Sequence, residues 1–422
     1  MTKVCLPYGK GEMAVELPGR CLGEVASPRN PPAGADAGKS IPDALENPIE
    51  SMPVERLVGP GKRVAVIVDD ISRNSPVRLV LPHLIERLGR GGVRAEDIRI
   101  VIALGTHRPM TASEIDEKIG PRMAKSFQIV NTPCDNEEEM VFAGVSSGGI
   151  PAWVNRAVMS ADVRIGVGSI TPHMDTGFSG GAKIILPGVC SARTVAAFHA
   201  RQAELSGNQL GVEEASLRLE LENFVSEKVG LDFIVNVVMD GRGEMVRCVA
   251  GNFLHAHRQG VRYAKEVYAV PVSKRYPLCI SNAYPAQVDF WQASKAIAAG
   301  EMMTRDGGTM ILLAHCMEGN KTHPAFAKYI GQSPDELIRL IESGKAQDLV
   351  ACAIAVTISK IRQRIRIALV STGLDDKTCG DMGFTYYRSL ESAVEKELSA
   401  LPHPGGSVGI LTHGGVSLPV LE

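Results

Sequence analysis

The sequence lacks the features that mark secreted, disulfide-stabilised or membrane-spanning proteins. Its nine cysteines stand singly among 422 residues, with no Cys-x-x-Cys pair, so we expect neither a disulfide framework nor a structural zinc site. No apolar run is long enough to span a bilayer, and the N-terminal stretch lacks the apolar core of a secretory signal. These absences favour a protein of the reducing cytoplasm without a membrane partner.

The sequence also lacks an excess of charge of either sign. Its 45 Lys and Arg residues nearly balance 47 Asp and Glu residues, so nothing indicates a nucleic acid partner. What it has in excess is glycine: many of its 43 glycines directly follow apolar runs, where the loops of α/β proteins bind ligands. The length allows two or three domains with a sizeable core.

Short, nearly continuous apolar runs alternate with helical patterns along the chain. Such runs predict strands buried on both faces, and their alternation with helices predicts parallel or mixed sheets. The expected fold class is therefore α/β, with two α/β domains and an active-site cleft between them. The predicted strands cover residues 63–70, 98–107, 127–133, 161–170, 232–240, 277–285, 309–316, 364–373 and 407–415, and the predicted helices cover 76–90, 192–205, 291–303 and 333–345.

The boundary between the two domains is predicted near residue 270, where a helical stretch gives way to a new strand. The expected domains are residues 1–270 and 271–422, and the last segment of the second domain may pack back on the first. The segment 28–48 is rich in Pro, Gly and Ala, which predicts a surface loop or connector.

Polar clusters follow several predicted strands, at the positions where strand ends build ligand sites. In "VDDISRNSP" the strand leads to Asp70 and Arg73, and an arginine there can bind a carboxylate or phosphate with two hydrogen bonds. A helix-capping aspartate and a solvated arginine explain the same residues. His107 in "LGTHRPMT" and His173 in "TPHMD" follow two other strands. A lone histidine is more often structural, but two could serve opposite faces of one substrate, as interconversion of mirror-image molecules requires.

The stretch "GFSGGAK" carries Ser179, Gly180 and Gly181 before Lys183. Its backbone N–H groups could form an anion nest, although a tight turn explains the glycines equally simply, and the order of residues is not that of a Walker A motif. Lys183 precedes another apolar run. A desolvated lysine has a lowered pKa and becomes nucleophilic, so Lys183 is a candidate phosphate contact or covalent attachment point.

Three further histidines lie in predicted helical stretches. His199 stands among apolar residues, which allows a packed interior histidine, and a metal site would need partners that no neighbouring HxH or HExxH motif supplies. The pair His255 and His257 forms an HxH pattern in a polar stretch, and we predict that it lies on the surface.

The last polar cluster, "YPAQVDFWQASKA", follows a strand and begins a helix. Gln292 and Lys295 lie three residues apart, on one face of that helix near its positive end. This suits an anion and a hydroxyl group, and an exposed amphipathic face accounts for the spacing equally well.

Taken in order, these clusters resemble the nickel-dependent lactate racemase (LarA-type) family. The residues that carry the resemblance are Asp-x-x-Arg at 70–73, "GTHRP", "PHMDTGFSGGAKIILPG", a later helical histidine and "WQASK". They extend from about Val64 to the C-terminus. The resemblance implies an isomerase, a racemase or epimerase that acts on a small-molecule 2-hydroxy acid similar to lactate.

The resemblance also implies a cofactor and a role for each candidate. The cofactor is a nickel-pincer nucleotide (pyridinium-3-thioamide-5-thiocarboxylic acid mononucleotide), loaded with the help of cofactor-synthesis proteins, and the first domain would bind it while the second clamps the substrate. In that family it is linked covalently to a lysine that Lys183 matches, and His199 matches the histidine that completes nickel coordination. His107 and His173 match the alternating acid and base. The remaining matches are Arg73, Gln292 and Lys295 for the substrate, and Asp70, Ser179, Gly180 and Gly181 for the cofactor.

Hydride transfer suits such a substrate. Its Cα–H is not acidic, so removing a proton would face a high barrier, whereas a pyridinium carbon can accept hydride without forming a carbanion. The glycines of the loop would leave room for a bulky nucleotide beside the backbone. Ala182 and Trp291 depart from residues common in lactate-racemising members, so the identity of the substrate's side chain is left open. A nicotinamide-dependent dehydrogenase, disfavoured by the absence of GxGxxG, and a non-catalytic ligand-binding paralogue are the alternatives.

Overall fold

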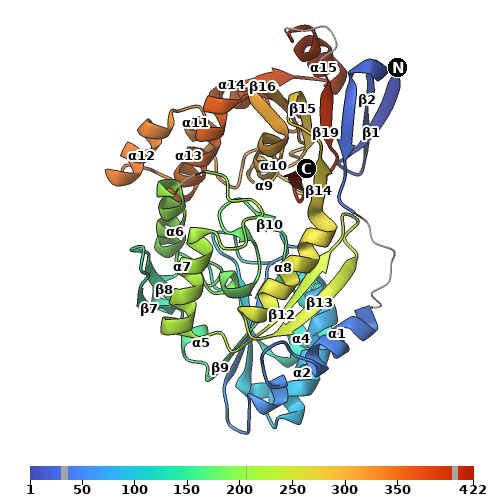
Figure 1. Ribbon diagram of the computed structural model, residues 1–422. Coiled ribbons are helices and arrows are strands. Elements are labelled where there is room, and N and C mark those ends of the chain that lie inside the picture. The colour runs from blue at the N-terminus through green and yellow to red at the C-terminus, as the bar shows by residue number, and fades with distance from the viewer. Residues whose placement is uncertain (30–36, 206, 402–406) are drawn as a thin grey trace.

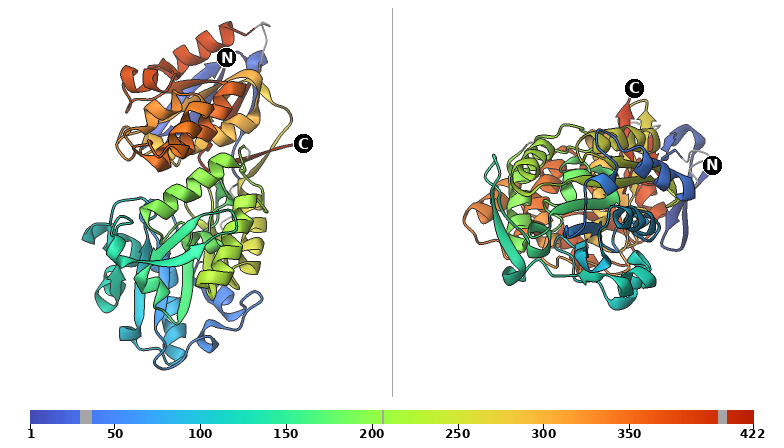
Figure 2. Two further views of the ribbon diagram at one scale, coloured as in Figure 1. Left: turned by 90° about the vertical axis from the view of Figure 1, so that its left-hand side faces the viewer. Right: turned by 90° about the horizontal axis from the view of Figure 1, so that it is seen from below.

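The chain folds into two α/β bodies, each built on a six-stranded sheet. The computed structural model describes residues 1–29, 37–205, 207–401 and 407–422. The bodies lie one above the other (Figure 1), and the side view in Figure 2 shows the C-terminal strand at their junction. The α/β prediction, with mixed or parallel sheets, is confirmed, and every predicted strand is present. Within the described residues no helix has the length and apolar character needed to cross a bilayer.

The first sheet has the strand order β13-β12-β9-β4-β5-β6. All of its pairs are parallel except β12 with β13, so the carboxyl ends of five strands share one edge. The central strand β4 is buried at every position, as its continuous apolar run predicts. The strands are β4 (Val64–Asp69), β5 (Ile98–Ala103), β6 (Gln128–Val130), β9 (Val163–Ser169), β12 (Phe233–Met239) and β13 (Met245–Gly251).

Helices cover both faces of this sheet. Alternate residues of β4 point to opposite faces: Val66 joins the core beneath α1 (Ala37–Glu46) and α2 (Val77–Arg90), whereas Ile67 joins the core beneath α7 (Ser216–Phe224). Helix α1 falls within the segment 28–48, so the loop predicted there is wrong for residues 37–46. Residues 30–36 of that segment lie outside the described residues.

The second sheet has the order β18-β17-β16-β15-β19-β3, and all its pairs are parallel. Its edge strand β3 comes from the beginning of the chain, and the hairpin of β1 (Thr2–Tyr8) and β2 (Gly11–Leu17) packs on the same body. The division at residue 270 stays a prediction. The strands are β3 (Leu22–Ala26), β15 (Tyr276–Asn282), β16 (Thr304–Leu313), β17 (Arg366–Val370), β18 (Thr385–Tyr387) and β19 (Val408–Leu411).

Two helices join the bodies directly. Helix α6 (Ala192–Glu204) of the first body lies against α13 (Leu349–Arg364) of the second (Figure 1). The Nζ atom of Lys360 donates to the carbonyl oxygen of Ala203 at 3.1 Å. Near the other end of the contact, a small apolar cluster brings Val195 of α6 together with Val350 of α13. The two bodies are therefore in direct contact through α6 and α13.

Candidate active site

A cavity of about 630 Å³ lies between the two bodies, within the size range of small-molecule and cofactor sites. Its walls come from the carboxyl edge of the first sheet, which is where ligands bind in open α/β sheets, and from helices α9 (Phe290–Ala293) and α10 (Lys295–Met303) of the second body. Ten of the eleven predicted site residues line this cavity, and Gly181 does not: the ten are Asp70, Arg73, His107, His173, Ser179, Gly180, Lys183, His199, Gln292 and Lys295.

At one side of the cavity a buried carboxylate holds a histidine. The Nδ1 atom of His107 lies 2.6 Å from Oδ2 of Asp70, and the Ser72 hydroxyl donates to Oδ1 of Asp70, also at 2.6 Å. Burial alone would raise the pKa of the Asp70 carboxyl, but the hydrogen bonds from His107 and Ser72 and the charge of Arg73 lower it to about 2. An ionised Asp70 that accepts the Nδ1 proton leaves Nε2 of His107 free to exchange protons with a ligand.

The loop that carries Asp70 and Arg73 rests on a buried lysine. Lys118 lies on α3 (Ala112–Ile119) and is 5% exposed. Its Nζ atom donates to the carbonyl oxygen of Arg73 at 2.6 Å and to the Ser75 hydroxyl at 3.0 Å, and it lies 2.9 Å from Oδ1 of Asp69. The sequence prediction missed Lys118, because one lysine in a mixed helix carries no local signal.

Elsewhere in the lining of the cavity His173 and Lys183 are in contact. The Nζ atom of Lys183 lies 2.5 Å from Nε2 of His173, and the backbone N–H of Asp175 donates to Nδ1 of His173 at 3.1 Å. Burial lowers the pKa of Lys183 well below its usual range, against the opposing charge of Asp175. Burial and the neighbouring cations, Lys183 first, likewise lower the pKa of His173. Burial thus favours the uncharged, nucleophilic form of the Lys183 amine.

The glycine-rich loop before Lys183 is fastened from beneath by Arg218 of α7. Its guanidinium, which is fully buried, donates to the carbonyl oxygens of Thr176 at 3.4 Å, Gly180 at 3.1 Å and Phe178. Burial lowers the pKa of Arg218 to about 10, and it remains charged at neutral pH. The three carbonyl groups therefore face a buried cation on the side of the loop away from the cavity.

His257 also fastens this loop, and the prediction that it lies on the surface is wrong. It is 1% exposed, and its Nε2 atom lies 2.8 Å from the carbonyl oxygen of Ser179, whereas His255 is exposed. The signal was present: His257 shares a helix face with the small or apolar residues Gly260, Val261 and Ala264, all of which are buried.

The glycines of the loop are required by the protein itself. Gly180 and Gly181 have φ angles of 75° and 58°, which favour glycine. A Cβ atom at Gly180 would lie 2.8 Å from Oδ1 of Asn236, and one at Gly181 would lie 2.9 Å from the ring of His257. Protein atoms alone therefore require these glycines, and the expectation that they also make room for a nucleotide stays a prediction.

Gln292 and Lys295 meet where α9 gives way to α10, so the single helix predicted over 291–303 is two helices. The Asp289 side chain caps α9 by accepting from the backbone N–H of Gln292 at 2.8 Å. The Nζ atom of Lys295 donates to Oε1 of Gln292 at 2.5 Å. Burial, together with the charge of Arg73, lowers the pKa of Lys295 well below its usual range. Arg73 and Lys295 bring two basic side chains from different bodies to one cavity, and a bound anion between them would favour the charged form of Lys295.

His199 lies on α6, with its Nδ1 atom 3.4 Å from Oδ2 of Asp175. Among the described residues, no group of three or more His, Cys, Asp or Glu side chains is arranged to hold a metal ion. A metal ion at His199 would consequently need further donors from a bound molecule. Imidazole with soft sulfur donors is a set that suits nickel or copper.

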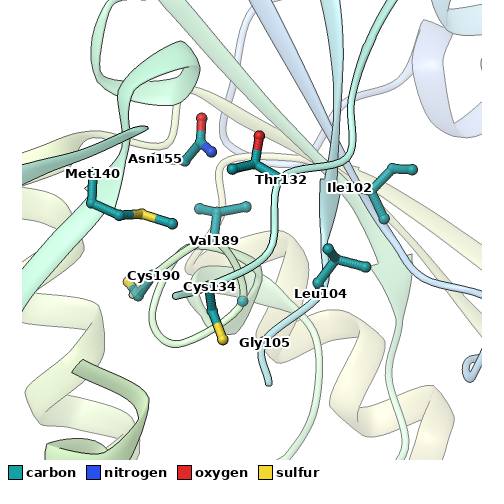
Figure 3. A pocket seen from close by; sticks show the side chains of 10 residues that line it. Ile102, Leu104, Gly105, Thr132, Cys134, Met140, Asn155, Val189 and Cys190 are labelled. Carbon is teal, nitrogen blue, oxygen red and sulfur yellow. The ribbon is translucent and has the colours of Figure 1, made fainter. Parts of the chain in front are cut away.

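A second, much smaller cavity of about 10 Å³ lies beside the first (Figure 3). Gly105, Leu104 and Gly188 line both cavities, and the backbone N–H of Gly105 donates to the carbonyl oxygen of Gly188 at 2.9 Å. The side chains of Cys134 and Cys190 border the small space. Its volume suffices for about one water molecule, so this smaller cavity has no room for a substrate or cofactor.

Comparison with known proteins places these residues in context. Residues 8–211 match the lactate racemase N-terminal domain family, and residues 277–418 match the lactate racemase C-terminal domain family. The chain is 28% identical over 433 residues to a lactate racemase of Thermoanaerobacterium thermosaccharolyticum, covering 100% of both chains. It is 26% identical over 411 residues to a lactate racemase of Lactiplantibacillus plantarum, covering 94% of this chain and 95% of the other.

Solved structures show the same fold. The lactate racemase apoprotein from Thermoanaerobacterium thermosaccharolyticum superimposes with a TM-score of 0.88 at 26% identity, over 99% of this chain and 100% of that one. A protein from Thermotoga maritima superimposes with a TM-score of 0.71 at 21% identity, over 91% of this chain and 98% of that one; this likeness concerns the fold alone.

Proposed function

Because this chain belongs to the lactate racemase family, a family of isomerases, we propose that it is a racemase or epimerase of a small 2-hydroxy acid. The observation that carries the proposal is that His107 and His173, from two separate strand ends, line one cavity. Interconversion of stereoisomers needs a proton acceptor and donor for each of two substrate orientations. Lactate, on which the named relatives act, is the simplest substrate of this class.

The two histidines are proposed to exchange protons with the substrate hydroxyl. Each has one ring nitrogen engaged by its own surroundings: Nδ1 of His107 meets Asp70, and Nδ1 of His173 accepts from the backbone N–H of Asp175. In His107 the Nε2 atom is left for the substrate side, whereas Nε2 of His173 meets Nζ of Lys183 and would turn to the substrate once the cofactor occupies that amine. A histidine that takes the hydroxyl proton of one stereoisomer can later return a proton to the other.

The substrate carboxylate is proposed to lie between Arg73 and Lys295. Both are cationic groups that line the cavity, and Arg73 presents a planar fork that suits a carboxylate. Gln292, 2.5 Å from Nζ of Lys295, has an amide N–H₂ group left to donate to the carboxylate or the hydroxyl. Since Arg73 and Lys295 belong to different bodies, substrate binding would draw the bodies together.

The residues present fit the cofactor that the family resemblance implies, a nickel-pincer nucleotide. Lys183 supplies a buried amine whose lowered pKa favours the uncharged form needed for covalent attachment. His199 supplies one imidazole, and no group of three or more protein metal ligands is found in the described ranges. Ser179 and Gly180 line the same wall of the cavity as Lys183. When bound, this group supplies a hydride acceptor and donor. We propose that cofactor-synthesis proteins load it onto Lys183.

A nicotinamide-dependent dehydrogenase gains no support from the loop geometry. A dinucleotide-binding loop places the phosphates at the N-terminus of a long helix. Here the loop leads only into a 3₁₀-helix of four residues, Gly181–Ile184.

The test is a racemisation assay on protein produced together with the cofactor-synthesis proteins. Enantiopure lactate, malate, phenyllactate, 2-hydroxyglutarate and aldonates would be followed by chiral chromatography, and intact mass would report the group on Lys183. We expect at least one acid to be racemised or epimerised, and Lys183→Ala to lose both the added mass and the activity. Failure to convert any acid, by protein whose Lys183 carries the added mass, would contradict the proposal and favour a ligand-binding protein without catalysis.

A further inference from the structure

Two buried polar atoms in the cavity wall lie close together without hydrogen-bond partners. The Oδ2 atom of Asp175 and the Nδ1 atom of His199 make no hydrogen bond within the described part of the chain, and they lie 3.4 Å apart. The side chain of Asp175 is 2% exposed and that of His199 is 12% exposed. Because buried polar atoms nearly always find a partner, a small closing of this distance with a proton on Nδ1 would satisfy both groups.

This contact decides which nitrogen of His199 can bind a ligand. If Nδ1 carries the proton and donates it to Asp175, Nε2 is unprotonated and its lone pair is free. Metal-binding histidines commonly donate a hydrogen bond from the N–H of their second ring nitrogen to a carboxylate. This hydrogen bond fixes the ring and makes it a better ligand. The ring is also held by an edge-to-face contact with Phe198, at 5.1 Å between ring centroids.

We propose that Asp175 is a positioning residue that orients His199 and fixes its tautomer for metal binding. The inference rests on the proposed function for the identity of His199 as the metal ligand. Asp175 reaches a second part of the site as well, since its backbone N–H donates to His173 at 3.1 Å. One residue of the turn between β10 (Pro172–His173) and β11 (Gly177–Phe178) thereby ties the proposed base to the proposed ligand.

The first experiment uses the protein without cofactor. Long-range ¹H–¹⁵N correlation spectra of histidine-labelled protein, assigned with His199→Gln, report the tautomer of His199. We expect the Nδ1–H form in the wild type and in Asp175→Asn, whose amide oxygen can still accept. In Asp175→Ala we expect His199 to lose its preference for the Nδ1–H tautomer. The proposal is overturned if the wild-type ring is in the Nε2–H form, or if Asp175→Ala leaves the tautomer unchanged.

The second experiment measures nickel retention in the loaded protein, at equal added mass on Lys183. Loss of an outer partner of a metal ligand weakens binding roughly 10- to 100-fold, so nickel should leave Asp175→Ala at least about tenfold faster in the presence of a chelator. The rate of nickel dissociation from Asp175→Asn should lie between the rates for Asp175→Ala and the wild type. An unchanged dissociation rate in Asp175→Ala would overturn the proposal.

A matched control separates this effect from a general loosening of α6. Glu220 is also a buried carboxylate, and its Oε2 atom accepts from Nε of Arg201 on α6 at 3.2 Å. Glu220→Gln should destabilise the packing of α6 without changing the His199 tautomer or the nickel dissociation rate. If wild-type Lys183 carries no added mass at all, the proposed function fails instead, and the spectra still decide the contact between Asp175 and His199.

Discussion

The Nζ atom of Lys183 and the Nε2 atom of His173 lie 2.5 Å apart, close enough that a single proton must serve both. Because Nδ1 of His173 accepts from a backbone N–H, the neutral ring carries its proton on Nε2 and can donate it to an uncharged lysine. Burial lowers the pKa of both groups, which favours their neutral forms over the charged ones. The same burial favours a nucleophilic amine at Lys183 before any cofactor is attached.

Lys183 should consequently react faster than other lysines at neutral pH. In the protein without cofactor, acylation with a small anhydride between pH 6 and 10, followed by peptide mass mapping, should show Lys183 modified from the lowest pH. Exposed lysines should be modified only at higher pH, because a solvated ammonium group gives up its proton less readily than a buried one. If the rate at Lys183 rises with pH in parallel with the surface lysines, its amine is not held neutral.

Asp70→Asn should lower turnover without abolishing substrate binding. The carboxylate orients His107 through the 2.6 Å contact with Nδ1, and proton transfer by a positioned base contributes on the order of 10²- to 10⁴-fold to a rate. We expect kcat to fall within that range and KM to change little, as measured by initial rates of racemisation. Ser72→Ala keeps the Asp70 carboxylate. If it lowered kcat as much as Asp70→Asn does, the orientation of His107 by that carboxylate would not explain the loss.

Asp70 should also give the fold a distinct sensitivity to acid. Its pKa is lowered from 3.8 to about 2 in the folded chain, so its contribution is complete above pH 4 and is lost as pH falls through 2. The shift corresponds to about 2 kcal/mol. Urea unfolding from pH 6 to pH 3 should show the stability difference between wild type and Asp70→Asn shrinking with acid. His107→Gln should reduce this pH dependence, because it removes the main partner.

Lys118→Met should destabilise the first body by about 3 kcal/mol, the cost of breaking a buried ion pair. The substitution leaves Asp69 buried and releases the carbonyl oxygen of Arg73. The double variant with Asp69→Asn should be destabilised by clearly less than the sum of the single variants, since neither charge is then left alone. Strict additivity in urea unfolding would show that the two residues do not interact.

Substrate affinity should weaken at alkaline pH. Burial lowers the pKa of Lys295 well below its usual range, so its positive charge, which attracts the substrate carboxylate, is lost at a lower pH than that of a solvated lysine. KM should rise between pH 7 and 10 in the wild type. Lys295→Arg keeps its charge throughout this range and should show a flatter profile, whatever its KM at pH 7. Identical profiles would exclude Lys295 as the group responsible.

The strands were predictable because burial on both faces leaves a direct mark on sequence. Helix α13 was not predicted, since its first residues, including Val350, Val356 and Ile358, are also nearly continuously apolar and β-branched. It packs against α6, α11 (Phe326–Ile330) and α12 (Pro334–Glu342), so it has few polar positions to reveal a helical period. Burial on many sides makes such a helix look like a strand.

The candidate site was only partly predictable. Residues directly after strands, such as His107 and His173, were identified because parallel strands deliver their ends to one edge. Lys118 and Arg218 escaped detection because each reaches the site from a helix remote in sequence and binds backbone carbonyl groups, which leave no mark on neighbouring residues. The pairing of Asp175 with His199 depends on the way α6 lies over the glycine-rich loop, and spacing along the chain does not reveal it.

The pairing of β3 with β19 has a consequence for the order in which the chain folds. The first sheet is formed by the continuous stretch 64–251, so it can fold while the chain is still being synthesised. The second sheet joins residues 22–26 to residues 408–411, and it stays incomplete until residues 408–411 have left the ribosome. The body that is proposed to bind the substrate is therefore completed after the first one, against a partner that is already folded.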